Sequence, residues 1–125
     1  MLEKLERNLQ KQEKSENMKR RSKYGNEIVT YEGEVFHSKA ELNRWKELKL
    51  LEAAKEITEL ERQPEFPLQI YGEVVCKYVG DFAYKERGQP TVEDVKGFPT
   101  DVYKLKRKLF EILYKGVKFV EIKAR

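Results

Sequence analysis

The stretch VGDFAYKERGQPTVEDVKG, residues 79–97, decides the fold of this 125-residue chain. Two runs rich in β-branched and aromatic residues flank Arg87-Gly88, which is the pattern of two antiparallel strands joined by a tight turn. If the turn is centred between Arg87 and Gly88, the numbers of paired residues sum to 175, and Asp81 lies opposite Asp94. Lys96 then shares the face of Asp94, because side chains alternate along a strand.

Two opposed carboxylates repel each other, so their presence in a sheet calls for an explanation. Directly opposed side chains lie about 4.5–5.5 Å apart at Cβ. A divalent cation between Asp81 and Asp94 would remove the repulsion, and hard oxygen ligands favour Mg²⁺ or Mn²⁺ over zinc. With Lys96 beside them to orient or help deprotonate a water, the pattern is typical of phosphodiester hydrolysis.

Spacing alone leaves two other interpretations open. Asp81 and Asp94 are explained equally well as edge-strand charges that pair with Lys96 or Lys77. A slip of one residue in the register would place Glu93, in place of Asp94, on the face of Asp81.

The sequence around this hairpin predicts an α/β fold with a mixed sheet. Upstream we expect short strands at 27–31 and 34–36, a helix opened by the capping box at 38–41 and ending near 55, and strands at 57–62, 66–71 and 74–84. Downstream we expect a strand at 91–96, a second amphipathic helix and a final strand at 117–122 that can pair in parallel. The apolar positions of the second helix are Val102, Leu105, Leu109, Ile112 and Leu113.

The charge of the chain is distributed unevenly. Residues 1–23 hold 8 basic and 4 acidic residues, residues 24–102 hold 10 and 16, and residues 103–125 hold 8 and 2. An acidic middle therefore lies between two basic ends, which suggests a polyanionic partner such as nucleic acid. The single cysteine, Cys76, excludes an internal disulfide and a cysteine-based zinc site.

The N-terminal residues 1–23 are predicted to lie apart from a domain formed by residues 24–125. Two interpretations remain open for this segment: a solvated helix or disordered tail, and a basic arm that contacts phosphates. The first ten residues lack the apolar core of a signal peptide and no apolar run is long enough to span a bilayer, so we expect a soluble intracellular protein with no membrane partner.

The hairpin resembles a known nuclease signature. Gly80-Asp81 followed by Asp94-Val95-Lys96 is similar to the PD-(D/E)XK motif of the restriction-endonuclease-like superfamily, with glycine in place of proline. Further segments occur in matching order, at residues 36–41, 60–64, 93–97 and 101–106. Together they resemble a small family of phage and prophage proteins described as Holliday-junction-resolvase-like, over about residues 26–123.

The resemblance implies a fold and a set of site residues. The fold is the αβββαβ core of restriction-endonuclease-like proteins, a mixed sheet flanked by helices. Asp81 and Asp94 would be metal ligands together with the backbone carbonyl of Val95, and Lys96 would position or activate the water. Glu41 matches an acidic residue that joins the metal site in resolvase-like members, although it is also the third residue of a capping box and would then turn back to Ser38.

The remaining candidates concern nucleic acid. Gln63 is placed to reach the site from a neighbouring strand or to satisfy backbone groups there. Tyr103, Lys106 and Arg107 lie on the second helix and either hold phosphates or form a solvated basic face. Glu93 is expected to point away from Asp94 and to be structural.

We therefore expect a Mg²⁺-dependent DNA endonuclease, with Mn²⁺ as a substitute for Mg²⁺, that acts on branched DNA such as a four-way junction. The resemblance further implies a homodimer that acts in the cytoplasm of a bacterial host. Two alternatives from other classes remain: a non-catalytic basic DNA-binding protein, and a phage packaging or structural accessory protein.

Overall fold

The computed structural model describes residues 27–124, which divide after Arg44 into two compact units. The expected N-terminal segment of residues 1–23 lies outside the described residues. Among residues 27–124, neither helix has the length and apolar character required to cross a lipid bilayer.

The first unit contains a small hairpin and the start of a helix. Strands β1 (Val29–Tyr31) and β2 (Glu34–Phe36) pair antiparallel around Glu32-Gly33, where both residues have positive φ, 50° and 78°. Positive φ at both central residues is the requirement of a type I′ turn. Helix α2 (Lys39–Ala53) follows, and the backbone N–H of Glu41 donates to Ser38 Oγ at 3.1 Å. The predicted hairpin and capping box are both confirmed.

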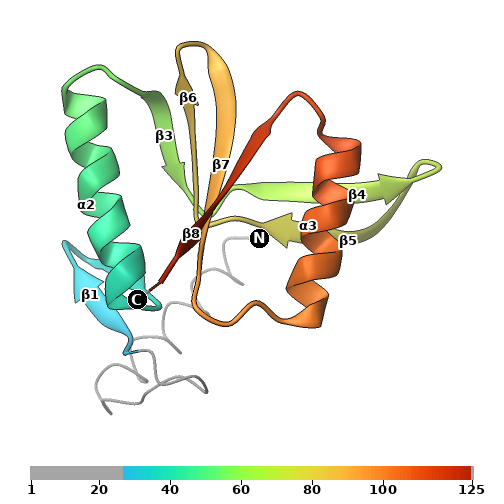
Figure 1. Ribbon diagram of the computed structural model, residues 1–125, viewed down its shortest axis with the longest axis horizontal. Coiled ribbons are helices and arrows are strands. Elements are labelled where there is room, and N and C mark those ends of the chain that lie inside the picture. Colours follow the sequence, from blue (N-terminus) through green and yellow to red (C-terminus); the bar gives the residue numbers. More distant parts are fainter. Residues whose placement is uncertain (1–26, 125) are drawn as a thin grey trace. The chain divides into compact units, whose positions relative to one another are not determined.

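The second unit is built on a four-stranded mixed sheet, drawn in Figure 1. Its strands are β3 (Thr58–Arg62), β6 (Phe82–Glu86), β7 (Gln89–Lys96) and β8 (Lys118–Lys123), in the spatial order β3-β6-β7-β8. The first three are antiparallel, whereas β7 and β8 are parallel and are connected through helix α3 (Asp101–Leu113). The expected mixed α/β class and the parallel final strand are confirmed.

The register of β6 and β7 is the predicted one. Pairs run from Phe82↔Glu93 to Glu86↔Gln89, so every pair sums to 175, and the turn residues Arg87 and Gly88 have φ of 52° and 79°. A one-residue slip is therefore excluded. The ladder ends at Phe82, and Asp81 is the first residue beyond it.

The long strand expected at residues 74–84 is wrong, because the structure has two strands there. β5 (Glu73–Val79) pairs with β4 (Glu65–Ile70) in a separate hairpin, and β6 starts only at Phe82. The break falls at Gly80, whose N–H donates to Pro64 O at 3.1 Å. A Cβ on Gly80 would lie 2.8 Å from Val92 Cγ1, so this close approach requires glycine.

The four-stranded sheet has an apolar core on each face. Ala83 and Val92 face one core, where they pack with residues of α3 and of the β4–β5 hairpin. Phe82 and Tyr84 face the other, where they pack with Leu48 of α2 and with Ile57. Alternation along β7 therefore directs Asp94 toward the α3 side and Glu93 toward the α2 side.

The side of helix α3 that packs into the core is not the side on which the sequence pattern placed its apolar residues. Tyr103 and Phe110 are its buried residues. By contrast, Val102, Leu105 and Ile112 are each more than half exposed. Thr100 caps the helix by accepting a 3.1 Å hydrogen bond from the Tyr103 N–H.

Candidate active site

Asp94 is the most deeply buried carboxylate of the candidate site. It is 1% exposed, and its Oδ2 accepts a hydrogen bond of 2.5 Å from Tyr78 OH. Its Oδ1 is buried and accepts no hydrogen bond, although Lys96 Nζ lies 3.0 Å away as an ion-pair partner. The ammonium supplies opposite charge at this oxygen but not an aligned donor, so Oδ1 keeps a lone pair for a further ligand.

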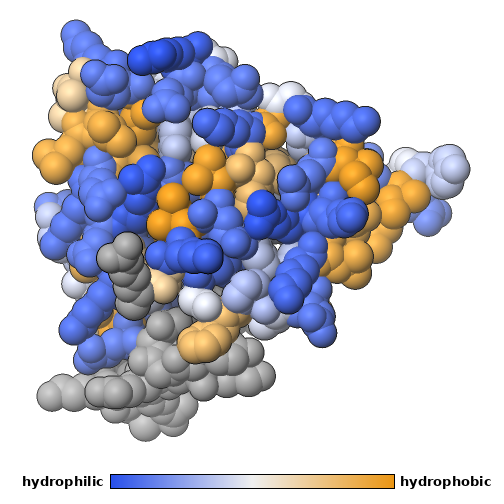
Figure 2. All heavy atoms as spheres, viewed as in Figure 1, coloured by the Kyte–Doolittle hydropathy of each residue, from blue (hydrophilic) through white to orange (hydrophobic). Residues whose placement is uncertain are grey.

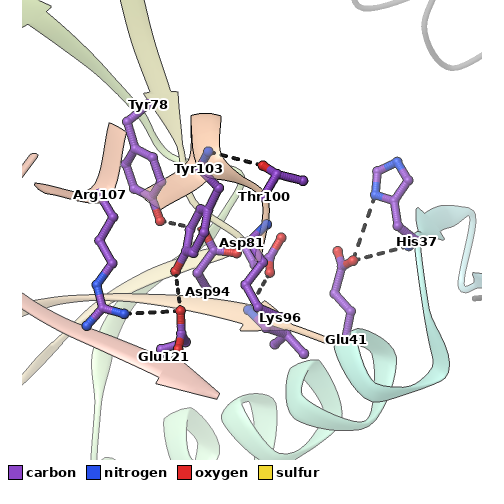
Figure 3. Close-up of polar contacts among 11 residues, drawn as sticks. His37, Glu41, Tyr78, Asp81, Asp94, Lys96, Thr100, Tyr103, Arg107 and Glu121 are labelled. Carbon is purple, nitrogen blue, oxygen red and sulfur yellow. Dashed lines mark hydrogen bonds and ion pairs between the residues drawn. The ribbon is translucent and has the colours of Figure 1, made fainter. Parts of the chain in front are cut away.

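Asp81 is anchored beside β7 by both its backbone and its side chain. Its N–H donates to Glu93 O at 3.0 Å, and its carbonyl accepts from Gln63 N at 2.9 Å. Its Oδ2 accepts from the Val95 N–H at 2.7 Å. The structure thus brings Asp81 to the same stretch of β7 as Asp94, and Figure 3 shows both carboxylates with Lys96.

Lys96 is held between a carboxylate and an aromatic ring. Its Nζ lies 3.0 Å from Asp94 Oδ1 and 4.6 Å from the centroid of the Tyr103 ring, and 31% of its side chain is exposed. Both partners attract the positive charge of the lysine. The lysine therefore has a fixed position at the rim, where a solvent molecule or a phosphate oxygen can reach it.

The sequence did not single out Glu121, which belongs to the same face. In the parallel ladder Glu121 of β8 pairs with Asp94 of β7, so both carboxylates project toward α3. Tyr103 OH donates to Glu121 Oε1 at 2.7 Å, and Arg107 Nη1 lies 3.1 Å from the same oxygen. Glu121 could have been identified only from the parallel pairing of residues 91–96 with residues 118–123, which sets it beside Asp94.

Tyr78 was also missed, because a tyrosine in an apolar strand is usually a core residue. Burial raises the pKa of Tyr78 above its ordinary value, and the neighbouring charge of Asp94 raises it further. The pKa of Tyr103 is likewise raised, first by burial and then by its hydrogen bond to Glu121. Both hydroxyls therefore stay protonated and act as donors to the carboxylates.

Glu41 has the contacts of a helix cap within the first unit. Its carboxylate accepts from the His37 backbone N–H at 3.2 Å and lies 3.8 Å from His37 Nδ1 (Figure 3). The capping interpretation explains these contacts, while the metal-ligand role of Glu41 stays a prediction.

Glu93 lies on the opposite side of β7 from Asp94, as expected. It is fully buried, and its Oε2 accepts a hydrogen bond from Tyr84 OH, a residue of the α2-side core. Its structural role follows from this position.

The four residues predicted to contact nucleic acid differ in how far they are exposed. Gln63 is exposed, and its backbone, which has a φ of 52°, is bonded to Asp81. Arg107 is engaged by Glu121 and by Glu111, 3.2 Å away, and its guanidinium lies 4.4 Å from the Phe119 ring centroid. Tyr103 is buried and Lys106 is half-buried. Arg107 would therefore have to exchange carboxylate contacts for a phosphate.

The residues present fit a hard divalent cation. Asp94 Oδ1 and the Val95 carbonyl of β7 offer oxygen donors, together with the carboxylate of Asp81, which hydrogen bonds hold beside β7, and Oδ1 lacks a hydrogen bond. Residues 27–124 contain no group of three or more His, Cys, Asp or Glu side chains that could hold a metal ion. Mg²⁺ does not require such a group, because it is commonly held by one or two carboxylates together with waters and substrate phosphates.

Comparison with known proteins gives one family. A family model with the description "Protein of unknown function (DUF1064)" matches residues 21–124, which is most of the chain. No curated protein matches it.

Proposed function

We propose that this chain, which belongs to the DUF1064 family, is a metal-dependent endonuclease that hydrolyses phosphodiester bonds in DNA. The observation that carries the proposal is the buried Asp94, with an unbonded Oδ1 and the Lys96 ammonium 3.0 Å from it. Oδ1 is ion-paired with Lys96 but accepts no hydrogen bond, so it retains a lone pair that a hard cation could use.

The element order supports the same assignment. Without the β4–β5 hairpin, the elements from α2 onward run α2, β3, β6, β7, α3, β8. This is the αβββαβ order of restriction-endonuclease-like proteins, and we assign the chain to that fold on this ground together with the Gly80-Asp81 and Asp94-Val95-Lys96 motif.

In the proposed reaction Asp81, Asp94 and the Val95 carbonyl would hold Mg²⁺, for which Mn²⁺ could substitute. When bound, the ion would stabilise the negative charge that develops on the phosphate. Lys96 would position the attacking water, and the Tyr103 ring, whose centroid lies 4.6 Å from Lys96 Nζ, keeps the lysine in place. Tyr78 fixes the orientation of the Asp94 carboxylate through its hydroxyl.

We further propose branched DNA as the substrate, a homodimer as the active form, and the cytoplasm of a phage-infected or lysogenic bacterium as the location. The resemblance to resolvase-like phage proteins supports these three points. A dimer suits a four-way junction because two sites related by symmetry can cut opposing strands.

The test is cleavage of four-way, flap, nicked and linear DNA in Mg²⁺, Mn²⁺ or EDTA. Wild type should cut the four-way junction only with a divalent ion, and Asp94→Asn should reduce the rate by about 10³-fold, as expected for loss of several kcal/mol of charge stabilisation. Glu73→Gln is the matched control, since Glu73 is exposed on β5. Cutting in EDTA, or by Asp94→Asn at the wild-type rate, would reject the mechanism. DNA binding without cleavage or Mn²⁺ affinity would favour the non-catalytic alternative.

A further inference from the structure

The second unit contains a cavity of about 520 Å³ that the proposed function does not use. Strands β3, β4, β6 and β7 and the residue before β8 form its walls, and its lining includes Glu61, Phe66, Ala83, Val92 and Val117. Pockets of roughly 300–1,000 Å³, lined by apolar side chains and a few polar groups, are typical of sites for small ligands.

The cavity lies beside the candidate site on the same face of the sheet. Val92 precedes Asp94 by two residues on β7, and Ala83 follows Asp81 by two residues. Ala83 and Val92 face the α3-side core, which is also the side toward which Asp94 projects. Two residues of a strand span about 7 Å. A phosphate held by Asp81 and Asp94 would therefore have its own nucleoside, or the next one, within reach of the cavity.

The interior of the cavity suits the flat face of a nucleobase. Its lining is aliphatic at Ala83, Val92 and Val117. Phe66 adds an aromatic ring, whose centroid lies 6.3 Å from that of the Tyr78 ring in the candidate site. The β4–β5 hairpin, which supplies Phe66, shows further apolar side chains on the face drawn in Figure 2. Aromatic rings stack on any base, whereas a phosphate loses its hydration against an apolar wall.

Carboxylates lie at the β3 side of the cavity. The β3–β6 ladder is irregular between Thr58 and Glu61, and Glu59 within this break has a φ of 55°. Such bulges redirect side chains and are frequent next to active sites. Glu61 pairs with Ala83 and therefore shares its face. Glu59 is held by Lys85, whose Nζ lies 3.1 Å from Glu59 Oε2. Carboxylates accept hydrogen bonds from the amino groups of bases and repel phosphates, so they favour a base over the backbone.

We propose that this cavity binds an unpaired nucleobase with an exocyclic amino group, next to the phosphate at which the DNA is cut. The proposal rests on the proposed function and names the feature of branched DNA that the site recognises. An unpaired base at a branch enters the cavity directly, whereas a base in a continuous duplex must first leave the stack. Cytosine, adenine and guanine carry an amino group, and thymine does not.

The first test is the binding of duplexes that contain one bulged nucleotide, either dC, dT or an abasic site, at fixed ionic strength in EDTA. Under the proposed function the DNA is not cut without a divalent ion, so the measurement does not depend on activity. Wild type should bind the dC bulge about tenfold more tightly than the abasic bulge, as expected of one stacked base. It should prefer the dC bulge to the dT bulge by about fivefold, because only cytosine offers an amino group to the carboxylates.

Glu61→Gln should reduce the preference for dC over dT to within about twofold, because an amide both donates and accepts hydrogen bonds. Glu86→Gln is the matched control, since Glu86 is exposed on β6 and lies on the opposite face of the sheet from Ala83. It should keep the wild-type preference. Equal binding of the three duplexes by wild type would overturn the proposal, and so would an equal loss of preference in the two variants.

The second test locates the base by NMR of methyl groups in the same complexes. Ring currents of the bound base should shift the resonances of Ala83 and Val117 with the dC bulge and not with the abasic bulge. The resonances of Leu48 and Ile57, in the core on the other face, should stay in place. Base-selective binding without shifts at Ala83 and Val117 would put the base elsewhere and overturn the proposal.

The cavity and the nuclease activity can fail separately. Base-selective binding without cleavage in Mg²⁺ would support the cavity and reject the function. Metal-dependent cleavage of four-way DNA without base selectivity would support the function and reject the cavity, and a chain that binds none of these DNAs would reject both.

Discussion

At the scale of single residues, the site depends on how one buried carboxylate is paired. Asp94 has Tyr78 on one oxygen and Lys96 beside the other, and the carboxylate itself is 1% exposed. Removing one partner of a buried ion pair leaves an uncompensated charge and costs about 3–5 kcal/mol, and less where the partner is partly exposed. Lys96 therefore contributes to folding as well as to the proposed chemistry.

We expect Lys96→Met to lower the free energy of unfolding by about 1–2 kcal/mol in EDTA, since the side chain of Lys96 is 31% exposed. Mn²⁺ should stabilise this variant more than it stabilises wild type, because the cation replaces the missing positive charge beside Asp94. Urea unfolding with and without Mn²⁺ measures both effects. Lys104→Met is the control for loss of a lysine, and an equal response of the two variants to Mn²⁺ would contradict the metal site.

Tyr103 gives a prediction about pH. Its hydrogen bond to Glu121 should make Tyr103→Phe less stable by about 1–2 kcal/mol near neutral pH, since the acceptor is charged. Because the pKa of Tyr103 is raised above 10.0 in the fold, the unfolded chain loses this proton first as pH rises. Above pH 10 the free energy of unfolding of wild type should then fall by up to about 1.4 kcal/mol per pH unit because of this residue. The difference between the free energies of unfolding of wild type and Tyr103→Phe should therefore become smaller. Urea unfolding of both proteins between neutral pH and pH 11 measures this difference, and a difference that stays constant over the range would contradict the prediction.

At the scale of the elements, Gly80 decides where β5 ends and β6 begins. Gly80→Ala should cost about 1–3 kcal/mol, because the added Cβ would lie 2.8 Å from Val92 Cγ1. Gly80→Pro should cost more, although it restores the proline of the PD-(D/E)XK pattern, since it also removes the N–H that donates to Pro64 O.

The control for Gly80→Ala is the double variant Gly80→Ala, Val92→Ala, in which the clashing methyl group is absent. Thermal unfolding should show that Gly80→Ala costs less in the Val92→Ala background than in wild type. Equal costs in both backgrounds would show that the contact with Val92 is not the cause.

The sequence predicted the β6–β7 register because a two-residue turn at Arg87-Gly88 fixes every pair that follows. It did not predict the break at Gly80, because apolar residues continue through Val79 and Phe82 and a strand pattern does not show which sheet a strand joins. The same register allowed Asp81, Asp94 and Lys96 to be placed close together from the sequence, and their role in a metal site stays a prediction. Glu121 lies 27 residues from Asp94 in the chain, and only the parallel pairing of β7 and β8 brings them together.

Helix α3 shows a second limit of sequence reasoning. The apolar spacing from Val102 to Leu113 predicted a helix correctly, but a helix has more than one face and hydrophobicity alone does not say which face a given core will accept. The core of the second unit uses the aromatic rings of Tyr103 and Phe110, whereas Val102, Leu105 and Ile112 are each more than half exposed.

At the scale of the whole molecule, the charge distribution predicts how DNA affinity should depend on metal. Residues 24–102 carry a net charge of −6 and residues 103–125 carry +6. Under the proposed function, DNA held by the basic end would have to approach the carboxylates of the acidic middle. Without a divalent ion, Asp81 and Asp94 should weaken DNA binding by repulsion, and with one bound the repulsion should fall.

We therefore expect Ca²⁺, which like Mg²⁺ takes carboxylate and carbonyl oxygens as ligands, to raise the affinity of wild type for four-way DNA severalfold over its value in EDTA. The variant with both Asp81→Asn and Asp94→Asn should bind in EDTA at least as tightly as wild type does with Ca²⁺, and added Ca²⁺ should then have no effect. Fluorescence anisotropy at fixed ionic strength measures this, because salt alone changes affinity steeply. Glu73→Gln is again the control and should respond to Ca²⁺ as wild type does. If the double variant keeps the full Ca²⁺ response, the ion acts elsewhere, and the two carboxylates are not the point at which the acidic middle meets DNA.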